Sequence, residues 1–112
     1  SWISLLLLAG LFAPLHAQVL VSTNSTWSYR KGTAEASSPV DAWRSRPFDD
    51  AAWTQSSAPF YYDTGGTYTG STLLGDMRNS YVSVFLRRKF MVSTPTDLGT
   101  LELRHLCDDG FV

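Results

Sequence analysis

The feature that most limits the possible folds is a run of alternating side chains between Tyr81 and Val92. An alternation with a period of two residues predicts a β-strand, because successive side chains of a strand point to opposite faces of its sheet. One apolar face and one mixed face are typical of an antiparallel sheet that covers a core on one side. Apart from Arg88, the face predicted to point inward is apolar and consists of Val82, Val84, Leu86, Phe90 and Val92.

Shorter apolar or alternating segments elsewhere in the chain predict further strands, and no sustained helical period of 3.6 residues appears after residue 17. Loops rich in Gly, Ser and Thr, over residues 32–40 and 65–75, separate these segments. Asp108-Asp109-Gly110 is typical of a hairpin turn. The sequence therefore predicts an all-β fold, with additional strands at Val19–Val21, Thr26–Arg30 and Leu101–Cys107.

The segment from Trp43 to Trp53 is expected to form a compact turn rather than a strand. Pro47 restricts the backbone, and Asp49 and Asp50 can accept hydrogen bonds from nearby backbone N–H groups. Trp43, Phe48 and Trp53 are predicted to hold this turn together by packing. The same reasoning assigns Trp27 to packing.

Residues 1–17 are typical of a secretion signal. Ile3 to Ala13 is an apolar stretch that is too short to cross a bilayer, and Pro14 ends it shortly before the small residue Ala17. Cleavage after Ala17 would begin the mature chain at Gln18. We therefore expect an exported protein, secreted or at the cell surface, whose mature part does not span a membrane. If residues 1–17 form secondary structure, an apolar helix is expected.

Charge and cysteine content exclude several classes of function. The chain has 9 Lys and Arg against 10 Asp and Glu, a net charge of −1, so a nucleic-acid partner is not expected. The basic run Arg87-Arg88-Lys89 should be divided between two faces of a strand. The single cysteine, Cys107, cannot form an internal disulfide and is expected to be a small buried apolar residue, and His105 is expected to face inward.

In order along the chain, these motifs resemble the galactose-binding-like β-sandwich modules of large secreted bacterial proteins. The resemblance covers nearly all of residues 18–112 and implies an antiparallel β-sandwich, or jelly roll. It also implies a fold that is incomplete at the C-terminus, because a strand that begins at Phe111 stops at Val112. The residues that carry the resemblance are Trp27, Tyr29, Trp43-Arg44, Pro47-Phe48-Asp49-Asp50, Trp53, Ala58-Pro59-Phe60-Tyr61-Tyr62, Tyr81, Phe85-Leu86-Arg87-Arg88-Lys89-Phe90, Leu101-Glu102-Leu103-Arg104 and Asp108-Asp109-Gly110-Phe111-Val112.

Such modules are usually accessories to other domains, so the resemblance implies a non-catalytic module with covalently linked domains downstream. Carbohydrate binding is frequent but not universal in the wider superfamily, so the resemblance implies a glycan as the expected partner. Two alternatives stay open. The chain could be a structural spacer or interaction domain, or the N-terminal fragment of a secreted hydrolase whose active site lies beyond residue 112.

Candidate glycan contacts lie around one glycine-rich loop. Tyr61, Tyr62 and Tyr68 flank Gly65-Gly66, and tyrosine rings can pack on the apolar face of a sugar. Arg78 and Asn79 precede the long strand and are expected to add polar contacts at the same end of the domain.

A catalytic or metal site is not expected. Asp49-Asp50 and Asp108-Asp109 are adjacent carboxylates in turns, whereas a glycosidase needs two carboxyls that face each other across the sugar. Turn carboxylates could instead hold a structural calcium ion, but the chain has no EF-hand-like spacing. We therefore expect no cofactor and leave calcium as the alternative.

Overall fold

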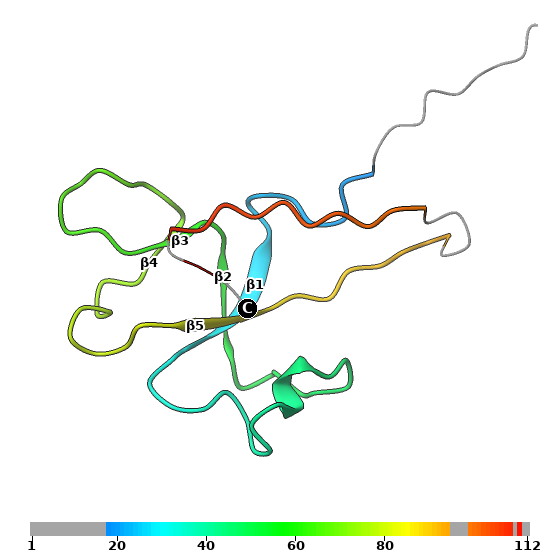
Figure 1. Cartoon of the computed structure of the whole chain (residues 1–112), viewed down its shortest axis with the longest axis horizontal. Helices are drawn as coiled ribbons and strands as arrows, with labels where there is room; N and C mark the ends of the chain where they lie inside the picture. Colours follow the sequence, from blue (N-terminus) through cyan, green and yellow to red (C-terminus); the bar gives the residue numbers. More distant parts are fainter. Residues whose placement is uncertain (1–17, 95–98, 109, 111–112) are drawn as a thin grey trace, which may run out of the picture.

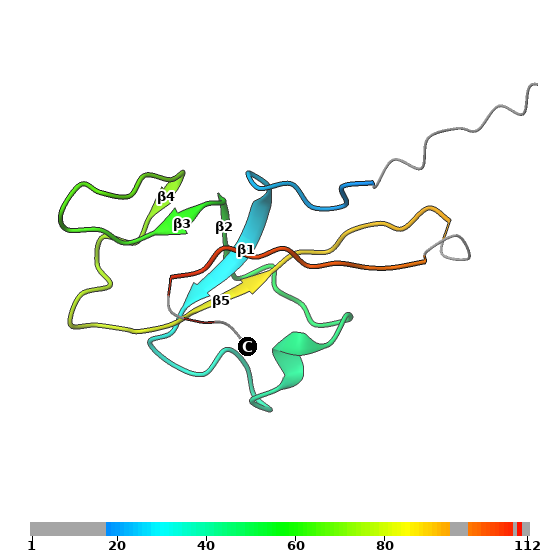
Figure 2. The same ribbon diagram turned by 45° about the horizontal axis from the view of Figure 1, so that its top comes forward.

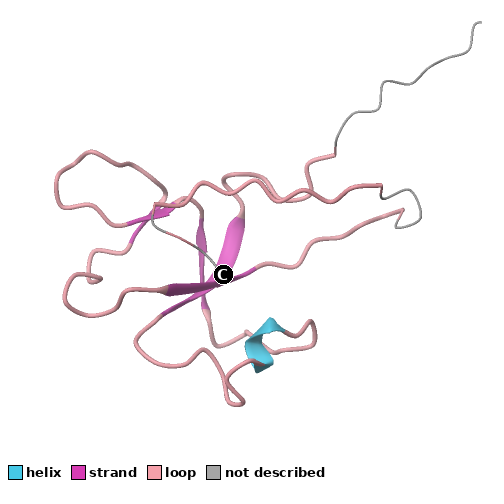
Figure 3. Ribbon diagram, in the orientation of Figure 1, coloured by secondary structure: helices cyan, strands magenta, loops and turns pink. Residues whose placement is uncertain are grey.

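The computed structural model describes residues 18–94, 99–108 and 110, and it contains two small β-sheets joined by long loops (Figure 1). The larger sheet is antiparallel and has the order β2 (Thr54–Ser57), β1 (Thr26–Lys31), β5 (Val84–Arg87). The smaller sheet pairs β3 (Phe60–Tyr61) with β4 (Thr72–Leu73) in parallel. The described residues contain no α-helix, and one 3₁₀ turn, η1, spans Ala42–Arg44 (Figure 3).

Strand β1 is the centre of the larger sheet and sets its register. Tyr29 pairs with Thr54 on one side and with Leu86 on the other, while Arg30 pairs with Phe85. Paired residues of an antiparallel sheet point to the same face. The sheet therefore has a first face that carries Trp27, Tyr29, Lys31, Val84 and Leu86, and a second face that carries Thr26, Ser28, Arg30, Phe85 and Arg87.

The β1–β5 pairing continues into a close backbone contact just after β1. The Gly32 N–H donates to the Ser83 carbonyl at 2.7 Å. A Cβ at this position would lie 2.6 Å from the same oxygen, closer than real Cβ contacts come. Glycine is therefore required where the chain leaves β1.

An aromatic cluster covers part of the second face. The ring of Trp43 lies 5.2 Å from Phe85 and 6.4 Å from Trp53, and Phe48 lies 5.9 Å from Trp53, measured between ring centroids. The contacts of Trp43 with Phe85 and of Phe48 with Trp53 are edge-to-face, a geometry that adds to the stabilisation provided by burial of the rings. The compact turn predicted for residues 43–53 is confirmed, since η1 and the following bends bring these aromatic side chains together.

Arg87 joins this turn to the sheet. Its side chain is 9% exposed, and its Nε donates to Asp50 Oδ2 at 2.9 Å. Its terminal nitrogens donate to the carbonyl oxygens of Trp43, Ser45 and Phe48, and its guanidinium lies 5.1 Å from the centre of the Phe48 ring. One buried cation thus satisfies a carboxylate and three carbonyls of a loop that has little regular structure.

The first face is covered in part by the smaller sheet and the segment after it. The Phe60 ring lies 5.1 Å from Tyr29, and the hydroxyls of Ser56 and Thr72 are 2.7 Å apart. Leu74 and Tyr81, in the segment that follows β4, are buried.

A second polar contact fixes the same region. Asp76 accepts hydrogen bonds from Lys31 Nζ at 2.6 Å and from the Tyr81 hydroxyl at 2.7 Å. These contacts lower the pKa of Asp76 and raise that of Lys31. Burial, and next the bond to Asp76, raises the pKa of Tyr81 to about 12.

The all-β class and the strand at residues 26–30 are confirmed, but two predicted strands are wrong. Val19–Val21 forms bends, and Leu101–Cys107 pairs with no other described strand and is exposed throughout. His105 and Cys107 are consequently exposed rather than inward-facing. Figures 1 and 2 show residues 99–108 running beside the segment after β5 without forming a sheet with it.

The long strand is shorter than predicted, and its apolar face is not buried. Strand β5 spans Val84–Arg87 alone, Val82 is 94% exposed, and Leu86 and Phe90 are also exposed. It is Phe85, on the face predicted to be mixed, that packs in the aromatic cluster. The basic run is not divided between two faces as predicted, because β5 ends at Arg87; Arg88 and Lys89 are both exposed, and all three residues line one hollow.

The predicted secretion signal, residues 1–17, and the start of the last strand at Phe111 lie outside the described residues. Within the described ranges, no helix has the length and apolar character needed to cross a membrane.

Replacement of Arg87 by Gln is expected to lower the free energy of unfolding by about 2–3 kcal/mol, because Asp50 and three loop carbonyls lose their donor. Urea denaturation followed by tryptophan fluorescence measures the change. Arg46→Gln is the matched control, since Arg46 is exposed. Equal stability of the two variants would contradict the role given to Arg87.

Alkaline pH is expected to destabilise the fold through Tyr81. Because the folded-state pKa of about 12 lies above the ordinary tyrosine pKa of 10.0, the contribution of this hydroxyl is complete below pH 10.0. It should decrease as the pH rises from there towards the folded-state pKa. Melting temperatures across this range measure the loss, which should be absent in Tyr81→Phe and retained in Tyr68→Phe.

Candidate functional site

The predicted tyrosine site lies around a loop that joins β3 to β4, residues 63–70, which we call the tyrosine loop. Asp63 organises it: Oδ1 accepts the Gly65 N–H at 2.9 Å and Oδ2 accepts the Tyr68 N–H at 2.7 Å. These backbone donors, with that of Tyr68 the strongest, hold the pKa of Asp63 below its usual value. Gly66 has a φ of 71°, a left-handed conformation that suits glycine.

The three tyrosines are not equally available to a ligand. Tyr61 and Tyr62 are half-buried, and Tyr61 lies so close to Gly70 that a Cβ there would be 2.8 Å from its ring. Tyr68 is 56% exposed, and its hydroxyl donates to Asp108 at 3.4 Å. Of the three rings, Tyr68 therefore offers the largest free surface.

Arg78 and Asn79 belong to a separate turn. The Ser80 N–H donates to the Met77 carbonyl at 3.0 Å, and Asn79 has a φ of 60°, which asparagine tolerates better than most residues. Both side chains are exposed. The segment 76–81 lies at the same end of the molecule as the tyrosine loop, but within the described residues no hydrogen bond or ion pair joins Arg78 or Asn79 to it (Figures 1 and 2).

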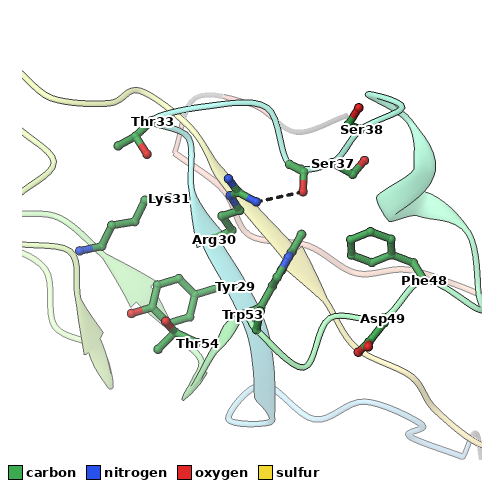
Figure 4. A pocket seen from close by; sticks show the side chains of 12 residues that line it. Tyr29, Arg30, Lys31, Thr33, Ser37, Ser38, Phe48, Asp49, Trp53 and Thr54 are labelled. Carbon is green, nitrogen blue, oxygen red and sulfur yellow. Dashed lines mark hydrogen bonds between the residues drawn. The ribbon is translucent and has the colours of Figure 1, made fainter.

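One hollow among the described residues lies beside β1, at its C-terminal end, and has a volume of about 530 Å³; a smaller one lies at the N-terminal end of the same strand. We call the larger one the aromatic groove, because Tyr29, Phe48 and Trp53 line it. In Figure 4 Trp53 stands between Tyr29 on one side and Phe48 on the other. Ala36, which is 1% exposed, forms part of the wall.

Polar groups surround these rings. Arg30 donates through Nη1 to the Ala36 carbonyl at 3.3 Å and keeps further N–H groups for a ligand (Figure 4). Asp49 uses Oδ1 to accept the Ala51 N–H at 2.9 Å, which leaves Oδ2 as an acceptor. Ser37 and Ser38 add hydroxyls to the lining. The groove can therefore offer both donors and acceptors next to apolar ring surface.

The carboxylates of Asp49 and Asp50 both make hydrogen bonds that hold the loop in place. Asp50 is paired with Arg87, and Asp49 accepts a hydrogen bond within its own turn. The two carboxyls line different hollows, since Asp49 borders the aromatic groove and Asp50 borders the smaller one. Neither hollow therefore contains the facing carboxyl pair that glycoside hydrolysis requires.

Metal-ligating groups are dispersed in the part of the chain that the structure describes. There, no cluster of three or more His, Cys, Asp or Glu side chains is placed to hold an ion. Asp109 lies outside the described residues, so the expectation about calcium stays a prediction.

The sequence pattern does not identify Arg30 and Asp49 as candidate site residues. Arg30 occupies an ordinary strand position, and Asp49 is a turn former that accepts the Ala51 N–H. The sequence feature that could have indicated them is that they directly follow Tyr29 and Phe48, two of the aromatic residues that line the groove. That signal identifies no groove by itself, because the same aromatic side chains also pack against each other.

Comparisons with known proteins found no similarity. No family model, no curated protein and no solved structure matches the chain.

Removal of the Asp63 carboxylate is expected to loosen the tyrosine loop. In Asp63→Ala the amides of Gly65 and Tyr68 lose their acceptor, so their hydrogen-exchange protection should fall, while Thr64→Ala should leave it unchanged. In the wild type the same protection should be present near neutral pH and be lost as the pH falls through the lowered pKa of Asp63. Unchanged amide protection in Asp63→Ala would show that other contacts order the loop.

Proposed function

We propose that this chain belongs to a non-catalytic β-sandwich module of the galactose-binding-like kind, that it is part of a secreted or surface protein, and that it binds carbohydrate. The all-β structure supports the fold part of this proposal, together with the ordered motifs from Trp27 to Gly110. The apolar segment at residues 1–17 supports export.

The aromatic groove is the observation that carries the binding part. A sugar ring presents an apolar face of C–H groups and a rim of hydroxyls, so its binding sites combine aromatic side chains with a few hydrogen-bonding groups. The groove contains this combination, with the rings of Tyr29, Phe48 and Trp53 beside Arg30 and Asp49. Its volume of about 530 Å³ falls within the usual range for small-ligand sites.

The tyrosine loop is the second place where a sugar could bind. Tyr68 presents an exposed ring on a loop that Asp63 holds in one conformation. The loop offers one exposed ring, whereas the groove has three aromatic side chains, and the Tyr68 hydroxyl and the Asp63 carboxylate already have partners. We therefore place the sugar in the aromatic groove.

The involvement of Asp50 in the Arg87 contact supports a non-catalytic role. A carboxylate whose position is needed to hold the loop is poorly suited to act as a general acid, since protonation would weaken the ion pair. The alternatives of a spacer domain, or of a hydrolase with its active site beyond residue 112, predict that this region retains no polysaccharide by itself.

Affinity electrophoresis of the full chain through gels that contain soluble polysaccharides tests the proposal. The wild type should be retarded by at least one neutral polysaccharide. Arg30→Met should reduce the apparent affinity by about tenfold, because a charge-assisted hydrogen bond to a hydroxyl is lost. Arg46→Met removes the same charge from an exposed loop and should have no effect.

Tyr68→Ala distinguishes the two locations. If it abolishes retardation while Arg30→Met does not, the sugar binds at the tyrosine loop rather than in the groove. If no gel retards the wild type, the proposal of carbohydrate binding is wrong and a role as a spacer domain is favoured. Each variant is checked by circular dichroism for an unchanged fold.

A further inference from the structure

The smaller hollow, of about 340 Å³, differs in character from the aromatic groove. We call it the basic groove, because Arg87, Arg88 and Lys89 line it together with Trp27, Ser28 and Gln55. It lies at the N-terminal end of β1, whereas the aromatic groove lies at the C-terminal end of the same strand.

The balance of charge in the basic groove is positive. Three cationic side chains line it, and the one carboxylate among its lining residues, Asp50, is already paired with Arg87 at 2.9 Å. Arg88 and Lys89 are therefore not neutralised there. This local excess contrasts with a chain whose net charge is −1.

Hydrogen-bond donors in the same groove have no partners. Within the described residues, the Lys89 ammonium, the Gln55 side-chain amide and the Trp27 indole N–H make no hydrogen bond. Arg88 is held in place by a bond from Nη1 to the Thr26 carbonyl at 2.6 Å, and its other nitrogens stay available. A positioned guanidinium beside free donors is suited to an anionic oxygen ligand.

We propose that the basic groove binds the carboxylate or sulfate group of an acidic polysaccharide, with Lys89 and Arg88 as its charged contacts. This inference rests on the proposed function and narrows the class of glycan. Arg87, Arg88 and Lys89 gather at one groove, which suits a single acidic group of a glycan. A nucleic acid would instead require a longer row of phosphate contacts.

Matched pairs of polysaccharides test the inference with the full chain in about 0.15 M salt, where long-range charge effects are screened. Polygalacturonate is compared with its carboxyl-reduced neutral form, and dextran sulfate is compared with dextran. Wild type should be retarded more by the acidic member of at least one pair. A preference within the first pair identifies a carboxylate, and one within the second identifies a sulfate.

Lys89→Gln should lower the apparent affinity for the acidic member by about fivefold, and leave that for the neutral member unchanged, since one exposed ion pair is lost. Arg46→Gln removes one positive charge elsewhere and should change neither affinity. Both side chains are exposed, so neither variant should alter the melting temperature.

The outcomes separate the two proposals. Equal retardation by both members of each pair, or an equal effect of Lys89→Gln and Arg46→Gln, overturns the inference and leaves carbohydrate binding intact. Competition by duplex DNA as strong as that by the acidic polysaccharide also overturns it, because the groove would then accept any polyanion. Absence of retardation on all four gels overturns both.

Discussion

The contact of Arg87 with the loop of residues 43–50 is the interaction on which the rest of the structure depends. This loop has one short 3₁₀ turn and otherwise lacks regular hydrogen bonding, so its carbonyls need donors from elsewhere. Arg87 supplies them from a strand and at the same time neutralises Asp50. With the loop held in this way, Trp43 and Trp53 can cover the second face of the sheet.

This contact also explains which parts of the fold the sequence could predict. The positions of β1 and of the compact turn follow from local features, namely aromatic residues in alternation and turn-forming Pro and Asp. The orientation of β5 does not follow from local features, because Phe85 and Arg87 face a loop that lies about 40 residues earlier in the chain. Alternation shows that two faces exist, and tertiary contacts decide which one is covered.

The same limit applies to the C-terminal segment and to the candidate site. Leu101, Leu103 and Cys107 alternate as a strand would, yet a strand needs a neighbour with free backbone groups, and the pattern does not identify one. The tyrosine loop was recognised from its glycines and tyrosines, and the structure orders it through Asp63. The aromatic groove was not recognised, because Arg30 and Asp49 belong to different elements that only the fold brings to one hollow.

The two grooves differ in chemistry because the adjacent carboxylates Asp49 and Asp50 have different partners in the loop. Asp49 keeps one oxygen free beside the aromatic rings, so its groove offers an acceptor for hydroxyl groups. Asp50 forms its ion pair with Arg87, and therefore it does not neutralise the charges of Arg88 and Lys89 in the neighbouring groove. A chain with nearly balanced charge thus acquires a local positive site, and the interaction that stabilises the fold is also the one that sets the sign of that site.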